Sequence, residues 1–201
     1  MNIASVLIKT TKKFHSKPAV IFRDQPISFL TLCDNVFKLA NGLLKLGIKK
    51  SDKVAIYLPN YPEYIYSYLA LFSIGATVVP LDYMLTEDEL SSCLSHCQAK
   101  LLIAKEKDAV SLENLKKRVL SLENIVVLEQ SKNNFKSFQD ILNSARPLPF
   151  EVEINDRDPA LIMYTSGTTG SPKGILLNYK HLDGSPRAME YFVDLTDKDV
   201  K

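Results

Sequence analysis

Short apolar runs alternate with amphipathic segments along the first two thirds of the chain. The runs are rich in Val, Ile and Leu and end at turn residues, as is typical of strands covered on both faces. Four of them predict strands at residues 53–58, 77–81, 99–104 and 124–129. The segments between them carry apolar residues at helical spacing and predict helices at residues 62–75, 87–97 and 109–122. Strands that alternate with helices imply an α/β fold with a doubly wound parallel sheet, flanking helices and right-handed crossovers.

Local signals predict where several helices begin and end. Ser28 is placed to cap a helix with an apolar stripe, and Gly47 follows that helix as a residue that tolerates positive φ. Thr86 and Glu89 have the spacing of a capping box at the start of the helix at residues 87–97.

The N-terminal part predicts three smaller elements. Apolar residues at near-helical spacing predict an amphipathic helix over residues 3–14, with its lysines on the outside. A short strand at residues 18–22 and a turn at residues 23–26 are expected to follow.

The composition changes after Leu128. The next stretch is polar, and it predicts a surface connector with one short helix around residues 138–142. Two apolar runs at residues 160–165 and 174–179 then flank a loop, which predicts a strand–loop–strand hairpin. The chain is thereby divided into an α/β subdomain at residues 1–129, a connector at residues 130–157, and a hairpin with a following helix at residues 158–201.

The loop between the two apolar runs, YTSGTTGSPKG at residues 164–174, is rich in hydrogen-bond donors. Gly167, Gly170 and Gly174 permit positive φ, so backbone N–H groups could converge on an anion. Lys173 adds a positive charge. Hydroxyl groups come from Thr165, Ser166, Thr168, Thr169 and Ser171. Convergent N–H groups, hydroxyls and an ammonium group suit phosphate.

Two other interpretations of this loop fit less well. A plain turn needs only about two to five residues, whereas about eight separate the two apolar runs here. The Walker pattern requires Gly before the lysine and Ser or Thr after it. Pro172 and Gly174 occupy those positions, so a kinase- or GTPase-type site is not expected.

Composition, charge and cysteines narrow the function further. A formal net charge of +2 offers no basic field for nucleic acid. The N-terminus has no signal-peptide core and no apolar run reaches the ~18 residues that span a bilayer, so a cytoplasmic protein without a transmembrane segment is expected. Cys93, His96 and Cys97 fall on one helix face, but a fourth metal ligand is missing, and buried thiols beside a polar imidazole are the better interpretation. These three residues are therefore not predicted to form a metal site.

The loop resembles the signature loop of the adenylate-forming superfamily of acyl-CoA synthetases, luciferases and peptide-synthetase adenylation domains. The upstream stretches DKVAIYLPNYPEY and LALFSIGATVVPLDYMLTEDEL resemble the same family in order and spacing, so the resemblance covers about residues 10 to 200. It implies that residues 1–201 are a partial AMP-binding (adenylation) domain, the N-terminal part of a ligase whose C-terminal remainder and small lid domain would lie outside this chain. In that family a carboxylic acid attacks the α-phosphate of Mg²⁺-bound ATP, and the acyl group of the acyl-adenylate then passes to a thiol, usually coenzyme A.

The resemblance also implies roles for single residues. Thr165, Ser166, Gly167, Thr168, Thr169 and Gly170 would bind the ATP phosphates, and Lys173 would help to neutralise them. The family often continues with Thr-His-x-Asn-Leu, whereas this chain has NYKHL, so no role is transferred to His181. The family's catalytic lysine, its magnesium-binding glutamate and the adenine pocket would lie beyond Lys201, so no catalytic residue is assigned in this chain.

Two hypotheses about the function follow. In the first, the chain is the N-terminal part of an ATP-dependent carboxylate–CoA ligase. It would be inactive alone and would have a complementary C-terminal fragment as its partner. The second is a non-catalytic remnant that acts as a phosphate-binding or protein-interaction module. Coding DNA that continues beyond Lys201 with family-like sequence would favour the first. The sequence does not indicate which carboxylic acid is used, and fatty, aromatic and amino acids all remain open.

Overall fold

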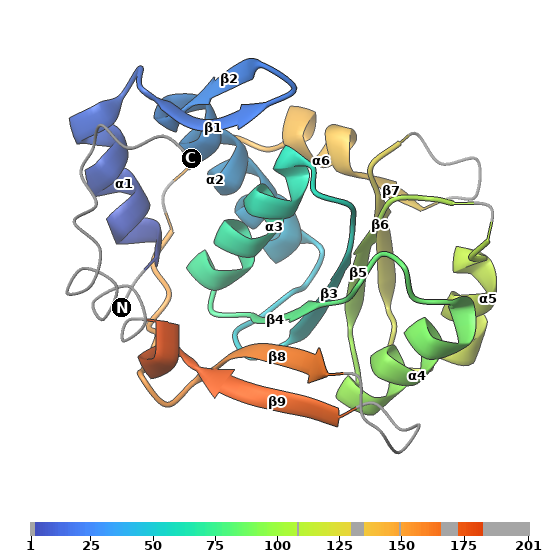
Figure 1. Cartoon of the computed structure of the whole chain (residues 1–201). Helices are drawn as coiled ribbons and strands as arrows, with labels where there is room; N and C mark the ends of the chain where they lie inside the picture. Colours follow the sequence, from blue (N-terminus) through green and yellow to red (C-terminus); the bar gives the residue numbers. More distant parts are fainter. Residues whose placement is uncertain (1–2, 108, 130–134, 149, 166–172, 183–201) are drawn as a thin grey trace.

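A seven-stranded sheet forms the centre of the protein (Figure 1). The structure, a computed structural model, describes residues 3–107, 109–129, 135–148, 150–165 and 173–182. The strands lie in the order β7-β6-β5-β3-β4-β8-β9, and only β9 runs antiparallel to its neighbour. Their bounds are β3 Lys53–Tyr57, β4 Thr77–Pro80, β5 Leu101–Ala104, β6 Asn124–Val127, β7 Lys136–Ser137, β8 Pro159–Thr165 and β9 Lys173–Asn178. The predicted parallel sheet and the predicted hairpin are both confirmed.

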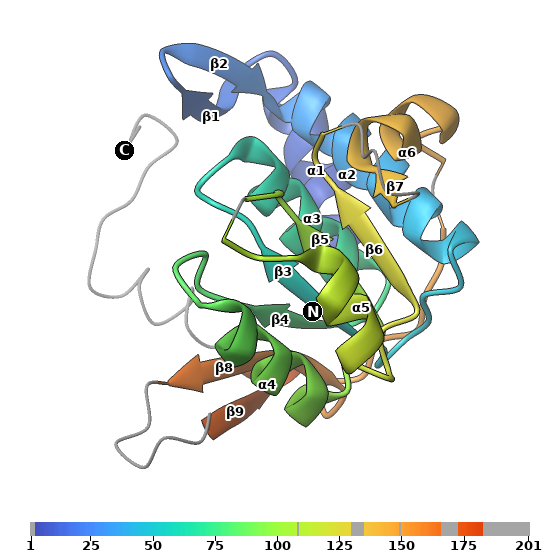
Figure 2. The ribbon, with the colours of Figure 1, turned by 90° about the vertical axis from the view of Figure 1, so that its right-hand side faces the viewer.

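Helices cover both faces of the sheet (Figures 1 and 2). One face carries α2 (Phe29–Lys45), α3 (Pro62–Ser73) and α6 (Phe138–Ser144), and the other carries α4 (Glu87–Cys97) and α5 (Leu112–Arg118). Successive residues of β3 show the alternation: Val54 and Ile56 enter the first core, and Ala55 and Tyr57 the second. The sheet is therefore doubly wound, as the sequence predicts. None of the helices in the described ranges is long and apolar enough to cross a membrane.

The N-terminal elements pack beside the main sheet. Helix α1 (Ile3–Phe14) precedes a two-stranded antiparallel sheet of β1 (Pro18–Phe22) and β2 (Gln25–Ser28). The predicted turn is shorter than expected, because only Arg23 and Asp24 form it, with φ of 50° and 63°. Positive φ at two central residues is typical of a two-residue hairpin turn, and it allows Gln25 and Pro26 to join β2.

The predicted helix ends are largely confirmed. Ser28 accepts a hydrogen bond from Thr31 N at the start of α2, and Gly47 has a φ of +82°. Thr86 and Glu89 form the capping box of α4. Helix α5 is shorter than predicted, because Ser111 caps its start and Val119 already has extended φ and ψ angles.

Part of the segment expected to be a connector packs against the main sheet and its helices. Strand β7 pairs with β6 at one edge of the sheet, and α6 packs against α2. Phe138 is 2% exposed, and Asn41 of α2 donates a hydrogen bond to the carbonyl of Leu148. The short helix predicted around residues 138–142 is confirmed as α6, and it buries a narrow apolar stripe. Strand β8 of the hairpin pairs directly with β4, so the hairpin extends the same sheet.

Gly42 marks the contact between α2 and α6. A Cβ atom at this position would lie 2.2 Å from Cγ2 of Ile141. We expect Gly42→Ala to destabilise the protein by about 1–2 kcal/mol, because overpacking outweighs the better helix propensity of alanine. Urea unfolding would measure this effect. In an Ile141→Ala background the cost should disappear, and a Gly42→Ala protein more stable than wild type would contradict the packing.

Candidate phosphate-binding site at the carboxyl edge of the sheet

The predicted phosphate loop leaves from the carboxyl edge of the parallel strands. Strand β8 runs parallel to β4, so Thr165 at its end lies on the same edge as the ends of β3, β4 and β5. Thr165 and Lys173 are direct partners across the β8–β9 ladder, and both are exposed. Ligands of open α/β sheets bind outside the carboxyl ends of the strands. The two described ends of the loop are therefore placed where a phosphate ligand would be expected.

Five of the predicted phosphate-binding residues lie outside the described part of the chain. They are Ser166, Gly167, Thr168, Thr169 and Gly170. The structure thus brings together Thr165 and Lys173 and describes none of the five residues between them on this list.

Gly174 has a different function from the one that its place in the loop predicts. It lies in β9, and its φ is not positive. A Cβ atom here would lie 3.0 Å from Cγ2 of Ile162 and 3.4 Å from Cε1 of Tyr164. Glycine is therefore needed because two side chains of β8 pack over this position.

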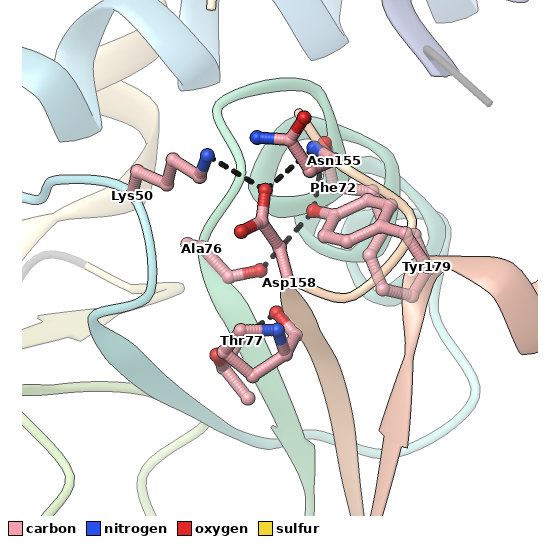
Figure 3. A network of polar contacts seen from close by, with 8 residues as sticks. Lys50, Phe72, Ala76, Thr77, Asn155, Asp158 and Tyr179 are labelled. Atoms are coloured by element: carbon pink, nitrogen blue, oxygen red, sulfur yellow. Dashed lines mark hydrogen bonds and ion pairs between the residues drawn. The ribbon is translucent and has the colours of Figure 1, made fainter. Parts of the chain in front are cut away.

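The base of the hairpin is held by a polar network at the corner between α3 and β4 (Figure 3). The hydroxyl of Tyr179, a fully buried residue, donates to the carbonyl of Phe72 at 3.0 Å. The carboxylate of Asp158 contacts Lys50 Nζ at 2.6 Å and accepts from Asn155 N at 2.6 Å. Sequence reasoning treated position 179 only as a departure from the family pattern and did not predict this anchor.

The ion pair of Asp158 predicts a dependence of stability on pH. Burial alone would raise the pKa of the Asp158 carboxyl, but the hydrogen bonds from Lys50 and Asn155 and the charge of Lys50 outweigh burial and lower the pKa. A lowered pKa means that the stabilisation is complete above the unfolded-state value of about 3.9 and is lost as the pH falls through the folded-state value.

Asp158→Asn should therefore lower the melting temperature most at neutral pH. The difference from wild type should shrink as the pH falls below about 4, where the wild-type carboxyl also becomes protonated. Thermal unfolding at a series of pH values would measure it. A difference that stays constant from neutral to acidic pH would contradict a role for the ionised carboxylate.

His181 takes no part in the loop in the described structure. It is exposed, and its Nδ1 accepts a hydrogen bond from Asn178 N at 3.2 Å, within the helical turn that begins at Tyr179.

The candidate metal ligands on α4 have other partners. His96 Nδ1 lies 2.7 Å from the hydroxyl of Tyr164. Burial, followed by the neighbouring Cys97 and Glu89, raises the pKa of the Cys93 thiol to about 11, which disfavours the thiolate that a metal would need. Within the described ranges, no group of three or more His, Cys, Asp or Glu side chains is arranged to hold a metal.

A cluster of lysines and tyrosines at the same edge was not predicted from the sequence. Lys107 Nζ donates to the carbonyl of Tyr83 at 2.7 Å and lies over the rings of Tyr57 and Tyr83. Lys105 forms an ion pair with Glu129. The Tyr57 hydroxyl donates to Leu85 O at 2.8 Å. Lys107 therefore holds the segment after β4 in place, and Lys105 is paired with Glu129. Lys173 remains the better candidate for binding phosphate.

The sequence matches a known family along nearly its whole length. The model of the AMP-binding enzyme family matches residues 7–199. The chain is 27% identical over 203 residues to 4-hydroxybutyrate–CoA ligase 2 of Metallosphaera sedula, and the match covers 94% of this chain and 36% of that protein. It is 33% identical over 168 residues to the acetyl-coenzyme A synthetase of Pseudoalteromonas atlantica, covering 75% of this chain and 26% of that protein.

Solved structures agree with the fold. A crystal structure of an anthranilate CoA ligase in complex with anthranoyl-AMP has a TM-score of 0.83 at 25% identity, over 90% of this chain and 35% of that chain. A long-chain-fatty-acid–CoA ligase from Archaeoglobus fulgidus has a TM-score of 0.85 at 26% identity, over 99% of this chain and 40% of that chain. The chain thus spans between about a quarter and two fifths of the length of these relatives.

Proposed function

Because the chain belongs to the AMP-binding enzyme family, we propose that it is the N-terminal part of an ATP-dependent carboxylate–CoA ligase. In the proposed reaction a carboxylate oxygen attacks the α-phosphorus of ATP and pyrophosphate leaves. The thiol of coenzyme A then attacks the acyl carbon of the acyl-adenylate, and AMP leaves. Coenzyme A is chosen as the thiol because the matched relatives are CoA ligases and synthetases. The carboxylic acid itself is left open.

The placement of Thr165 and Lys173 is the observation that carries this proposal. Thr165 is the last residue of β8 and Lys173 is the first residue of β9, so the two paired residues flank the donor-rich loop at the carboxyl edge of the sheet. In the proposal, the loop binds the β- and γ-phosphates, and the Lys173 ammonium offsets the charge of the leaving pyrophosphate. Such charge stabilisation is a main source of catalysis in phosphoryl-type chemistry. The proposed phosphate ligands are Thr165, Ser166, Gly167, Thr168, Thr169, Gly170 and Lys173.

Magnesium would enter together with ATP. A carboxylate in the remaining part of the ligase would hold it, because Mg²⁺ in such sites binds through one or two carboxylates and the substrate phosphates, and it would supply positive charge to the phosphates. This chain contributes the positively charged side of the phosphate site.

One face of the β8–β9 hairpin is exposed and apolar, which supports the proposal that a complementary part of the same ligase covers it. Met163 and Ile175 are opposite each other on β8 and β9, on one face of the hairpin, and are 47% and 52% exposed. Strand β9 is the last strand of the described sheet, so one of its edges is unpaired there. An exposed apolar face beside an unpaired strand edge is typical of a surface that another protein segment covers. The matched relatives are much longer than this chain and would supply such a segment. We assign the C-terminal remainder of the same ligase to this surface.

Binding of ATP to the purified chain tests the proposed function. In a ³¹P NMR titration with Mg²⁺-ATP, the β and γ resonances should change more than the α resonance. Lys173→Met should weaken this binding, since one charge-assisted hydrogen bond is worth about 1.5–3 kcal/mol. Lys180→Met is a matched control, because Lys180 is an exposed lysine close to the base of the same hairpin. Unchanged ³¹P resonances at millimolar protein would refute the phosphate site.

A further inference from the structure

We propose that His96 is a positioning residue for the phosphate loop and acts through the hydroxyl of Tyr164. The inference rests on the proposed phosphate-binding function, and it extends the site to α4. Tyr164 directly precedes Thr165, the first predicted phosphate ligand. Figure 2 shows α4 lying beside the β8–β9 hairpin, on the side of the sheet opposite α2 and α3.

Tyr164 makes two hydrogen bonds to α4 through one hydroxyl group. His96 Nδ1 lies 2.7 Å from the Tyr164 oxygen, and the hydroxyl donates to the carbonyl of Cys93 at 3.2 Å. The rings of His96 and Tyr164 meet edge to face, with centroids 5.7 Å apart and an interplanar angle of 73°. Distances and ring geometry agree that the end of β8 is joined to α4 at this point.

The proposal includes which nitrogen of His96 carries the proton. A tyrosine hydroxyl has one hydrogen to donate, and we assign it to the carbonyl of Cys93, 3.2 Å away. The Tyr164 oxygen would then accept from His96, with Nδ1 of His96 protonated. Burial, followed by the neighbouring Cys97 and Cys93, raises the pKa of the Tyr164 hydroxyl, which keeps it a donor.

The ring of Tyr164 is held on its other side by β9. Gly174 faces it across the ladder, and a Cβ atom there would lie only 3.4 Å from the ring carbon Cε1. The ring thus packs on the backbone of β9 while its hydroxyl bonds to α4. With Tyr164 held at both ends, the backbone of the adjacent Thr165 has a fixed starting position, as a preorganised binding site requires.

His96 can be replaced without opening the core, because its side chain is exposed. A loss of phosphate binding in His96→Ala could then be separated from a loss of folding by comparing melting temperatures. His96→Asn is the conservative variant, because its amide nitrogen can take the place of Nδ1. Tyr164→Phe keeps the ring on Gly174 and removes only the hydroxyl. His15→Ala, at an exposed histidine after α1, is the matched control.

The first measurement is the tautomer of His96 by ¹⁵N NMR of the imidazole rings, at a pH where they are neutral. His96 should be protonated at Nδ1. His181 should show the opposite tautomer, because its Nδ1 accepts from Asn178 N. In Tyr164→Phe, His96 should lose its preference for the Nδ1–H form. An Nε2–H tautomer of His96 in the wild-type chain would overturn the proposal.

The second measurement is the affinity of the full chain for inorganic pyrophosphate. His96→Ala should weaken binding about fivefold, the effect of one net hydrogen bond, and Tyr164→Phe at least as much, because it also removes the bond to Cys93 O. The double variant should be no weaker than Tyr164→Phe, since that substitution already removes the bond to His96. His96→Asn should restore most of the affinity. If all variants bound pyrophosphate with the wild-type affinity, the positioning role of His96 would be overturned and the proposed phosphate site would stand. A wild-type chain that binds no pyrophosphate would refute the proposed phosphate site and the positioning role with it.

Discussion

The purified 201-residue chain is expected to catalyse no ATP–pyrophosphate exchange, whereas a chimera that supplies the rest of a ligase is expected to catalyse it. In the chimera this chain replaces the matching part of 4-hydroxybutyrate–CoA ligase 2 of Metallosphaera sedula, which the match covers to 36%. Exchange requires the adenine, the acid and the phosphates to be held together, and the chain is proposed to hold only the phosphates.

Radioactive pyrophosphate incorporated into ATP measures this difference directly. Exchange should depend on 4-hydroxybutyrate, because the acid pocket is expected to come from the relative. A robust exchange activity of the purified chain alone would show that the chain holds more of the active site than proposed.

Lys173→Met in the active chimera is expected to lower the exchange rate about 100-fold, as is typical when a group that stabilises developing charge is removed. The ammonium group would neutralise the pyrophosphate as it leaves, and methionine keeps the length of the side chain without its charge. Lys180→Met in the same chimera should leave the rate within about twofold, because surface substitutions away from a site have small effects.

The loss should appear in the maximal rate as well as in the KM for ATP, since the proposed contact strengthens when charge builds up on the leaving group. If Lys173→Met raised only the KM for ATP, Lys173 would bind the substrate without stabilising the transition state. If Lys173→Met left both the exchange rate and the KM for ATP of the chimera unchanged, Lys173 would not be part of the phosphate site.

Much of the fold could be predicted because its signals are local. The four parallel strands are continuous apolar runs, and the capping box of Thr86 and Glu89 is readable from four consecutive residues. The hairpin of β8 and β9 follows from two apolar runs that flank a polar loop. Such patterns depend on neighbours in the sequence and not on what lies across the core.

Other features depend on contacts between distant segments and leave little trace in the sequence. Helix α6 has only seven residues, and its burial depends on α2, where Gly42 makes room for Ile141. Strand β7 has two residues, too few for any alternation to be visible. Tyr179 is identifiable as an anchor only once its hydroxyl is seen to meet the carbonyl of Phe72, 107 residues away in the sequence.

The candidate site divides in the same way. The donor-rich loop and Lys173 could be predicted, because phosphate binding requires glycines, hydroxyl groups and a cation that can be recognised from the residue types alone. The contact of His96 with Tyr164 could not, because it joins residues that are 68 positions apart. The sequence did bring His96 to attention, but as a candidate metal ligand beside Cys93 and Cys97, since spacing on one helix says nothing about the strand that packs against it.

The central claim, that residues 165–173 bind the phosphates of ATP, is tested most directly by affinity labelling of the purified chain. The reagent is an adenosine polyphosphate with a pyridoxal aldehyde on its terminal phosphate, which forms an imine with a nearby lysine and is fixed by borohydride reduction. Peptide mass spectrometry should find the label on Lys173, and excess ATP should prevent its attachment there. Labelling that ATP does not prevent, or ATP-sensitive labelling of Lys105 or Lys107 with Lys173 unmodified, would contradict the claim.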